Sequence, residues 1–522
     1  MKSLLISIII TLNCIIVSVS CFNHYPAPDQ YHKHRSTNLD LLYATITDLK
    51  EALNDLQITP AQLVHQYLRR IQEVNREGPE LNAVIETNPD AEKIAHKLQY
   101  GKGALNGIPI LVKDIIDTAD RLSTTAGSYA LLGSKVPRDA FVIRQLRKAG
   151  AIILGKTSLS EWSGFRVFNI SRQGVSARGG VSKSAYVTNG DPLGSSSGSA
   201  IAVSVGLCAA ALGEETDGSI IGPASRNGIV GMKPTVGLTS RSGVIPISHI
   251  QDSIGPMAKT VEDVALLLEV IQGEDPRDNA TVGVRRESCY TKYLKGVSGF
   301  KGVRVGVLRY DVITNATNPE QVKVFDEAVK LIRSHGALVK DPIRLKNSDE
   351  LDLPAELIVA VGQFKENIEN YLRQLKHTKI RTLRDIINFN NDHKSLEFNQ
   401  YLSDQDIFLF AENTIVTSED LANYARLAQS LEQTLEKHHL DILITLAEFG
   451  TRPSAIAGSP MITVPLGYLQ VGDGTTDLQP FGLGIMGRKW SEGLLLKVAH
   501  AFEQATHVRD RVRPKYAPKD SY

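Results

Sequence analysis

Two serines that lie 24 positions apart, Ser195 and Ser219, are the clearest candidates for chemistry in this 522-residue chain. Each belongs to a short segment of small and polar residues, GSSSGSA around the first and GEETDGS up to the second. The run between them, residues 199–212, consists of small and apolar residues and predicts one buried, closely packed helix. Such a helix is expected to bring two hydroxyl-bearing turns into one neighbourhood.

A lysine at the end of an apolar strand is a third candidate. Residues 108–112 (IPILV) predict a buried strand that runs directly into Lys113. Burial of a charged ammonium group costs free energy unless the group is neutral or paired. A lysine at a strand end more often reaches solvent, so a buried Lys113 needs a chemical reason.

Together, the three segments resemble the amidase signature family, whose members cleave amide bonds with a Ser-Ser-Lys triad. Lys113 in LVKDIIDT stands at the family's lysine, Ser195 at the first serine of its G-S-S block, and Ser219 at the nucleophile of G-x-x-T-[GD]-G-S-I. The resemblance covers nearly all of residues 41–510 and is closer to the peptide-amidase branch than to the fatty-acid-amide-hydrolase branch. One departure is Glu214, which replaces the threonine or serine common after the glycine.

The resemblance implies a serine hydrolase that cleaves linear amides without a metal ion or other cofactor. Ser219 is expected to carry the acyl group, Ser195 to pass the proton, and a neutral Lys113 to act as base. Gly194, joined to Ser195 by a cis peptide bond, and Ser196 are expected to support the site. The expected donors to the oxyanion are the backbone N–H groups of Thr216, Asp217, Gly218 and Ser219.

The order of predicted elements fits the fold that the resemblance implies, a single α/β/α domain around a large mixed β-sheet. Thr59, Pro60 and Gln62 predict the start of an amphipathic helix. A helix over residues 139–149, between strands at 108–112 and 151–154, predicts a parallel βαβ unit. The remaining expected elements are strands at 303–307, 442–446, 461–464 and 481–486 and helices at 322–332 and 491–505.

Composition divides the chain into four segments. Residues 1–21 predict a secretory signal peptide, with Lys2 before an apolar stretch and a cleavage site near Ser20 or Cys21. The alternative is an uncleaved segment that anchors the protein in a membrane. The other segments are a polar lead-in at 22–40, an amidase domain at 41–510 that contains a variable helical substrate cap at 340–440, and a C-terminal tail at 511–522.

The balance of basic and acidic residues indicates which classes of binding partner to expect. With 58 basic and 57 acidic residues, the chain gives no electrostatic reason to expect nucleic acid or an anionic membrane, and the expected partner is a small-molecule or peptide amide. Sequons at Asn169, Asn279 and Asn315 are compatible with secretion. Cys208 is expected to be a small buried residue and has no metal-ligand spacing to Cys289.

Three other functions remain open from the sequence. The segment GSSSG also matches the nucleophile elbow of an α/β-hydrolase, which would make Ser196 the nucleophile of an esterase or lipase. The chain could be a catalytically inactive binding protein on an amidase scaffold. It could also be the A subunit of a glutamine-dependent tRNA amidotransferase, although the predicted signal peptide argues against that role.

Overall fold

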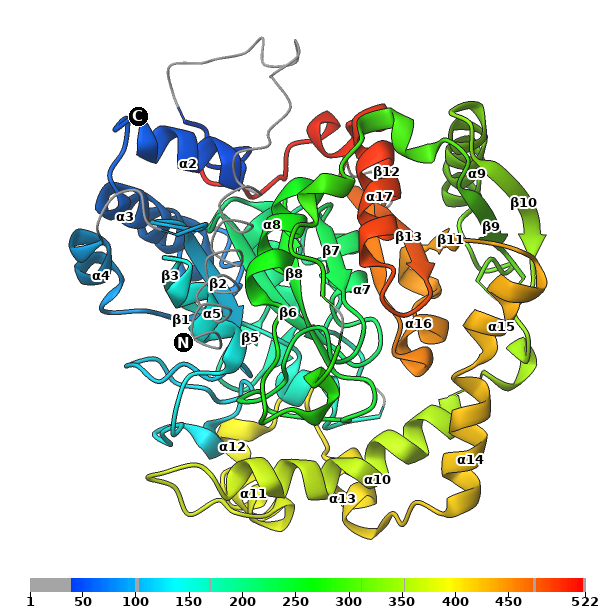
Figure 1. Cartoon of the computed structure of the whole chain (residues 1–522). Coiled ribbons are helices and arrows are strands. Elements are labelled where there is room, and N and C mark those ends of the chain that lie inside the picture. Colours follow the sequence, from blue (N-terminus) through cyan, green and yellow to red (C-terminus); the bar gives the residue numbers. More distant parts are fainter. Residues whose placement is uncertain are drawn as a thin grey trace, which may run out of the picture.

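An 11-stranded mixed β-sheet forms the centre of the computed structural model (Figure 1). The structure describes residues 39–98, 103–168, 170–284, 286–310, 312–351, 353–472 and 476–519. In spatial order the strands are β1 (Val84–Thr87), β3 (Ile152–Thr157), β2 (Pro109–Lys113), β6 (Ala210–Glu215), β8 (Ser253–Ala258), β7 (Val230–Lys233), β12 (Met461–Gln470), β13 (Leu478–Gly487), β11 (Ile442–Leu446), β9 (Arg304–Leu308) and β10 (Leu338–Ile343). A separate two-stranded sheet contains β4 (Val175–Ser176) and β5 (Gly180–Val181).

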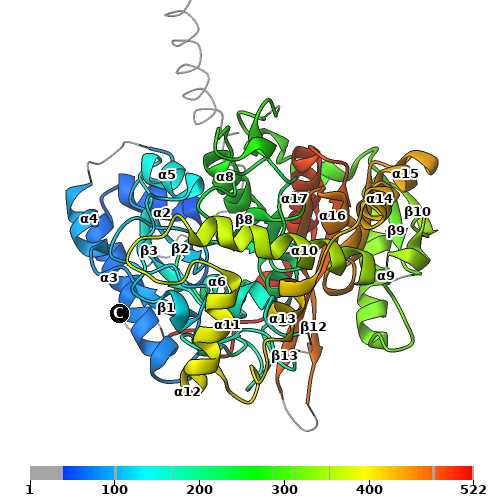
Figure 2. The same cartoon turned by 90° about the horizontal axis from the view of Figure 1, so that it is seen from below.

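Helices cover both faces of the large sheet, which gives an α/β/α arrangement. On one face α5 (Phe141–Lys148), α8 (Val261–Ile271) and α17 (Glu492–Thr506) pack together, and α6 (Ser197–Ser204) lies on the other (Figure 2). Helix α7 (Ile221–Arg226) also packs against the central strands. The other helices before β11 include α2 (Ile46–Asn54), α3 (Pro60–Ile71), α4 (Ala91–Lys97) and α9 (Pro319–Ser334).

The segment expected to form a helical cap is mainly helical. It contains α10 (Leu353–Leu372), α11 (Leu383–Asp392), α12 (Lys394–Glu397), α13 (Asp406–Asn413), α14 (Ser418–Leu427) and α15 (Ser430–Lys437), and α16 (Arg452–Ala457) follows β11. Helices α10–α13 lie along one end of the molecule, below the central strands in the view of Figure 1. In Figure 2 the same helices lie in front of the sheet.

Several sequence expectations are confirmed. Strands β2 and β3 pair in parallel with α5 between them, so the predicted βαβ unit is present. The predicted helix start at Thr59 is a capping box, in which the Thr59 hydroxyl accepts the Gln62 N–H at 3.2 Å. The expected signal peptide and the sequon residue Asn169 lie outside the described residues.

The expectation of one helix over residues 199–212 is wrong. Helix α6 ends at Ser204, Gly206 adopts a left-handed φ of +69°, and the chain returns as β6. Helix and strand are both buried along their whole length, so neither shows the periodicity that would tell them apart. The return matters for the site, because a straight 14-residue helix would separate the two serine turns by about 20 Å.

Helix α6 packs so closely on its neighbours that residue 198 has no room for a side chain. A Cβ atom on Gly198 would lie 2.2 Å from the Ala83 carbonyl oxygen and 2.5 Å from the Ser158 nitrogen, both backbone atoms. We therefore expect Gly198→Ala to lower the free energy of unfolding by about 1–3 kcal/mol through overpacking. Urea unfolding followed by circular dichroism measures the effect.

Gly222→Ala is the matched control, because a Cβ atom there would meet only Leu193 Cδ1 at 3.6 Å and the Gly194 oxygen at 3.9 Å. Its free energy of unfolding should not fall. Equal stability of the two variants would show that α6 can shift away from the strands without cost.

Candidate active site

The topology of the sheet brings polar residues to one edge. Strands β2 and β6 are parallel neighbours, so their carboxyl ends, at Lys113 and Glu215, lie at the same edge. Strand β8 pairs antiparallel with β6 and therefore begins at this edge, directly after Asp252. Helix α6 packs against β2 and β6 and begins near Ser195.

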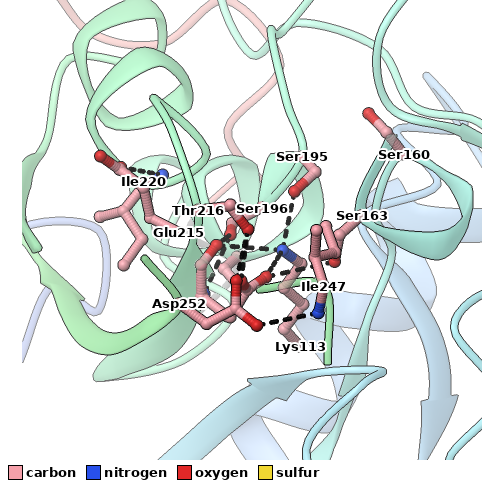
Figure 3. Close-up of polar contacts among 12 residues, drawn as sticks. Lys113, Ser160, Ser163, Ser195, Ser196, Glu215, Thr216, Ile220, Ile247 and Asp252 are labelled. Atoms are coloured by element: carbon pink, nitrogen blue, oxygen red, sulfur yellow. Dashed lines mark hydrogen bonds and ion pairs between the residues drawn. The ribbon is translucent and has the colours of Figure 1, made fainter. Parts of the chain in front are cut away.

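The Lys113 amine is the centre of the site. Its side chain is 0 % exposed, and Nζ donates to Ser195 Oγ at 2.8 Å (Figure 3). The same nitrogen donates to the Glu214 carbonyl oxygen at 3.0 Å and to Glu214 Oε2 at 2.8 Å. The sequence-predicted lysine and serine are thus in direct contact.

Burial and the neighbouring carboxylate act on Lys113 in opposite directions. Burial holds the pKa of the Lys113 amine below its ordinary value, because water cannot solvate the ammonium form. The negative charge and the hydrogen bond of Glu214 oppose this effect and favour the ammonium form. The position therefore permits a neutral amine, as required of a base.

The two serine segments are joined through the backbone. The Gly194–Ser195 peptide bond is cis, as the resemblance predicts. The Ser196 N–H donates to the Ser219 carbonyl oxygen at 3.0 Å, which places the two segments side by side. Within the described residues, the Ser219 hydroxyl makes no hydrogen bond, and the side chain retains a path to solvent since Ser219 is 8 % exposed.

The turn that carries Ser219 is held by buried carboxylates. Glu215 Oε2 accepts the N–H groups of Ile220 at 2.6 Å and Ile221 at 2.9 Å, and burial raises the pKa of Glu215 to about 7. The Thr216 hydroxyl donates to Asp252 Oδ1 at 2.8 Å. Gly218 has a φ of +75°, in the left-handed region that favours glycine. No acceptor in the described part of the chain takes the N–H groups of residues 216–219, so they can face a bound oxyanion.

Ser196 has a different environment from the other two serines. It is fully buried, and its hydroxyl donates to the Glu214 carbonyl oxygen at 3.1 Å and accepts the Glu214 N–H at 3.3 Å. No strand lies within residues 182–196, whereas a nucleophile elbow needs a strand directly before it. The structure therefore contradicts the α/β-hydrolase alternative for Ser196.

Helix α10 of the cap contacts the loop that carries Asp252. Asp252 Oδ2 accepts the N–H groups of Ile247 and Ser248 at 2.8 and 3.0 Å. From α10, Gln363 accepts the Ser248 hydroxyl at 2.9 Å, and Asn367 donates to the Ile247 carbonyl oxygen at 3.0 Å. Helix α10 is thus linked through Asp252 to the turn that carries Ser219.

Charged side chains make a second connection between α10 and the turn that carries Ser219. Glu356 pairs with Arg452 at 3.1 Å, and Arg452 lies 3.8 Å from Asp217 Oδ2. Burial and the nearby Asp217 raise the pKa of Glu356 to about 8. The Thr451 hydroxyl donates to Asp217 Oδ1 at 2.6 Å, so the turn is fixed from the α16 side as well.

Sequence reasoning missed several of these residues. Glu214 and Glu215 lie inside the GEETDGS segment and could have been singled out as adjacent carboxylates on one strand. Asp252, Glu356 and Arg452 carried no local signal, because only the tertiary fold brings them to the turn.

The described residues were also searched for groups of metal ligands and for membrane-spanning helices. Among the residues that the structure describes, no three His, Cys, Asp or Glu side chains form a group that could hold a metal ion. Over the same ranges, no helix is both long and apolar enough to cross a bilayer. Cys208 is a free buried thiol, as expected, whereas Cys289 is disulfide-bonded.

Comparison with known proteins places the chain in a family. The profile of the Amidase family matches residues 62–496. A protein of Arabidopsis thaliana named "Probable amidase" is 41% identical over 493 residues, covering 91% of this chain and 92% of its own. The native peptide amidase of Stenotrophomonas maltophilia has the same fold, with a TM-score of 0.83 and 36% identity over 92% of this chain and 100% of its own.

A more distant match is the A subunit of the glutamyl-tRNA(Gln) amidotransferase of Thermoanaerobacter pseudethanolicus, 31% identical over 502 residues, or 90% of this chain and 97% of its own. Family match, fold and the identities to proteins named amidases agree that this chain is an enzyme. The chain belongs to the amidase family.

Proposed function

We propose that this amidase hydrolyses linear amides through an acyl-enzyme on Ser219, with Ser195 and Lys113 as proton relay and base. One observation carries the proposal: the buried Lys113 amine donates to the Ser195 hydroxyl at 2.8 Å, next to the segment that carries Ser219. A buried amine beside a hydroxyl is the arrangement that activates a weak nucleophile.

In the first half-reaction Ser219 Oγ attacks the amide carbonyl carbon. Its proton passes to Ser195 Oγ, and the Ser195 proton passes to the neutral Lys113 amine. The backbone N–H groups of residues 216–219 stabilise the oxyanion. When the carbon–nitrogen bond breaks, the proton returns through Ser195 to the leaving nitrogen. Water then repeats these steps on the ester and releases the acid.

A peptide amide is the substrate class that we favour. The sequence motifs and the 36% identity to a protein named peptide amidase both support this class. The contacts of α10 with the loop at 247–252 and with Arg452 support a role of the cap in choosing among amides. The greater identity to the Arabidopsis thaliana relative than to the amidotransferase relative, 41% against 31%, favours a free-standing hydrolase.

Secretion is a second part of the proposal. The N-terminal sequence pattern supports a signal peptide that ends near Cys21. Asn279 and Asn315 are exposed, so both sequons could carry glycans without disturbing the core.

Labelling with a fluorophosphonate tests the nucleophile. The adduct should lie on the peptide that contains Ser219, and Ser219→Ala should abolish labelling. Ser195→Ala should slow labelling by about 100- to 10,000-fold, because it removes the proton relay. Ser196→Ala should have a milder effect, since it removes only the two hydrogen bonds of the Ser196 hydroxyl to the Glu214 backbone. Digestion and mass mapping locate the adduct, and an adduct elsewhere with Ser219→Ala still reactive would disprove the assignment.

The pH dependence of amide hydrolysis tests the base. The neutral Lys113 amine is present above its lowered pKa and is lost as pH falls through it, so kcat/KM should decline on the acid side. Lys113→Met keeps the side-chain volume and should lower kcat/KM by about 100- to 10,000-fold. Circular dichroism checks that the variant is folded. An acid-side decline that is identical in wild type and Lys113→Met would remove Lys113 from the mechanism.

Expression in a secreting eukaryotic host tests the location. N-terminal sequencing of protein from the medium should begin near Cys21 or Phe22, and removal of N-glycans should reduce its mass. Asn279→Gln and Asn315→Gln should each remove one glycan. Recovery of a membrane-bound product with an intact Met1 would instead establish the anchor.

A further inference from the structure

Glu214 stands beside the catalytic lysine at a place where the family commonly has threonine or serine. Its side chain is 2 % exposed, and its Oε2 accepts from Lys113 Nζ at 2.8 Å. Threonine cannot supply a negative charge there, so this chain adds a carboxylate to the Ser-Ser-Lys arrangement.

We propose that Glu214 is a positioning residue for the base: its carboxylate holds the Lys113 amine against Ser195 and retains the proton on it, so that the triad becomes competent only at more alkaline pH. This inference rests on the proposed function and concerns its regulation by pH.

The reason is the charge balance of the buried pair. With one shared proton, an ammonium and a carboxylate form a neutral pair, which a low-dielectric interior tolerates far better than an isolated charge. Lys113 can accept a proton from Ser195 only after the pair has lost its own proton. The pair then carries a net negative charge, and the attraction of Glu214 for the proton delays this loss. Burial by itself has the opposite effect, because it lowers the pKa of the Lys113 amine and so favours loss of the proton.

Neutral side chains hold Glu214 in this position. The Ser163 hydroxyl donates to Glu214 Oε2 at 3.2 Å, and the Thr216 hydroxyl, which shares its one proton with Asp252 Oδ1, lies 3.2 Å from Oε1. Trp162 and Ser163 both adopt left-handed backbone geometry, with φ of 52° and 57°. Non-glycine residues seldom occupy this region, and such strain persists mainly at functional sites. The strained segment places the Ser163 hydroxyl within hydrogen-bond distance of Glu214 Oε2.

Asp252 and Glu215 also act on the charge of Lys113, and each has its own partners. Asp252 reaches the pair through the Thr216 hydroxyl, and burial together with the charge of Glu214 raises its pKa to about 7. Glu215 accepts two backbone N–H groups and lies in the field of Lys233. Asp217, farther along the turn, pairs with Arg452 at 3.8 Å. Only Glu214 touches the amine among the carboxylates that the structure describes.

The test is the rate of fluorophosphonate labelling at Ser219 as a function of pH, which needs no knowledge of the natural substrate. Glu214→Thr restores the common family residue, and Glu214→Gln keeps the shape without the charge. Both should move the midpoint of the acid limb to lower pH by about one to three units, the effect of an opposite charge at this distance. Glu214→Asp keeps the charge, and its midpoint should stay near that of wild type.

A midpoint that is the same in wild type, Glu214→Thr and Glu214→Gln, with the adduct on Ser219 in all three, would overturn this inference and leave the proposed function intact. An adduct elsewhere than on Ser219 in wild type would overturn the proposed function itself. Asp252→Asn is the companion variant and should move the midpoint less than Glu214→Gln. An equal or larger shift for Asp252→Asn would assign the pH dependence to Asp252 and overturn the role of Glu214.

Discussion

The contact of the buried Lys113 amine with Ser195 and Glu214 is the interaction on which the site depends. A fully buried amine is tolerated because three acceptors surround it, and it can lose its proton because no water solvates its charge. The contact forms because β2 and β6 are parallel neighbours whose carboxyl ends meet at one edge, while α6 returns Ser195 to that edge. Much of the central sheet therefore serves to bring three segments of the chain, around residues 113, 195 and 214, within hydrogen-bond distance.

Much of the architecture could be predicted because its signals are local. The strand that leads into Lys113 reads as an apolar run, and the capping box at Thr59 is a pattern of neighbouring residues. The prediction of a single helix over residues 199–212 was wrong for a physical reason. Helix α6 and strand β6 are both wholly buried and both rich in small apolar residues, so hydrophobic periodicity, which depends on one face being polar, carries no information there.

The electrostatics of the site could not be predicted from neighbouring residues. Alternation along β6 sends the adjacent carboxylates of Glu214 and Glu215 to opposite sides of the strand, the first to Lys113 and the second to the N–H groups after Ser219. Both glutamates can be seen in the sequence, but the groups that they contact cannot be inferred from it. Asp252, at the start of β8, reaches the Thr216 hydroxyl only because β8 pairs antiparallel with β6.

Under the proposed function, the residues that carry out the chemistry and the helix that selects the substrate belong to different parts of the fold. Lys113, Ser195 and Ser219 depend on strands and helices of the central layers, whereas α10 reaches the nucleophile turn through the loop before β8 and through Arg452. A ring contact ties the same helix to the residues just after the strained segment, since Phe364 of α10 lies 5.0 Å from Phe165, ring centroid to centroid. Under the proposed function, we therefore expect changes in α10 to alter which amide fits without moving Lys113, Ser195 or Ser219.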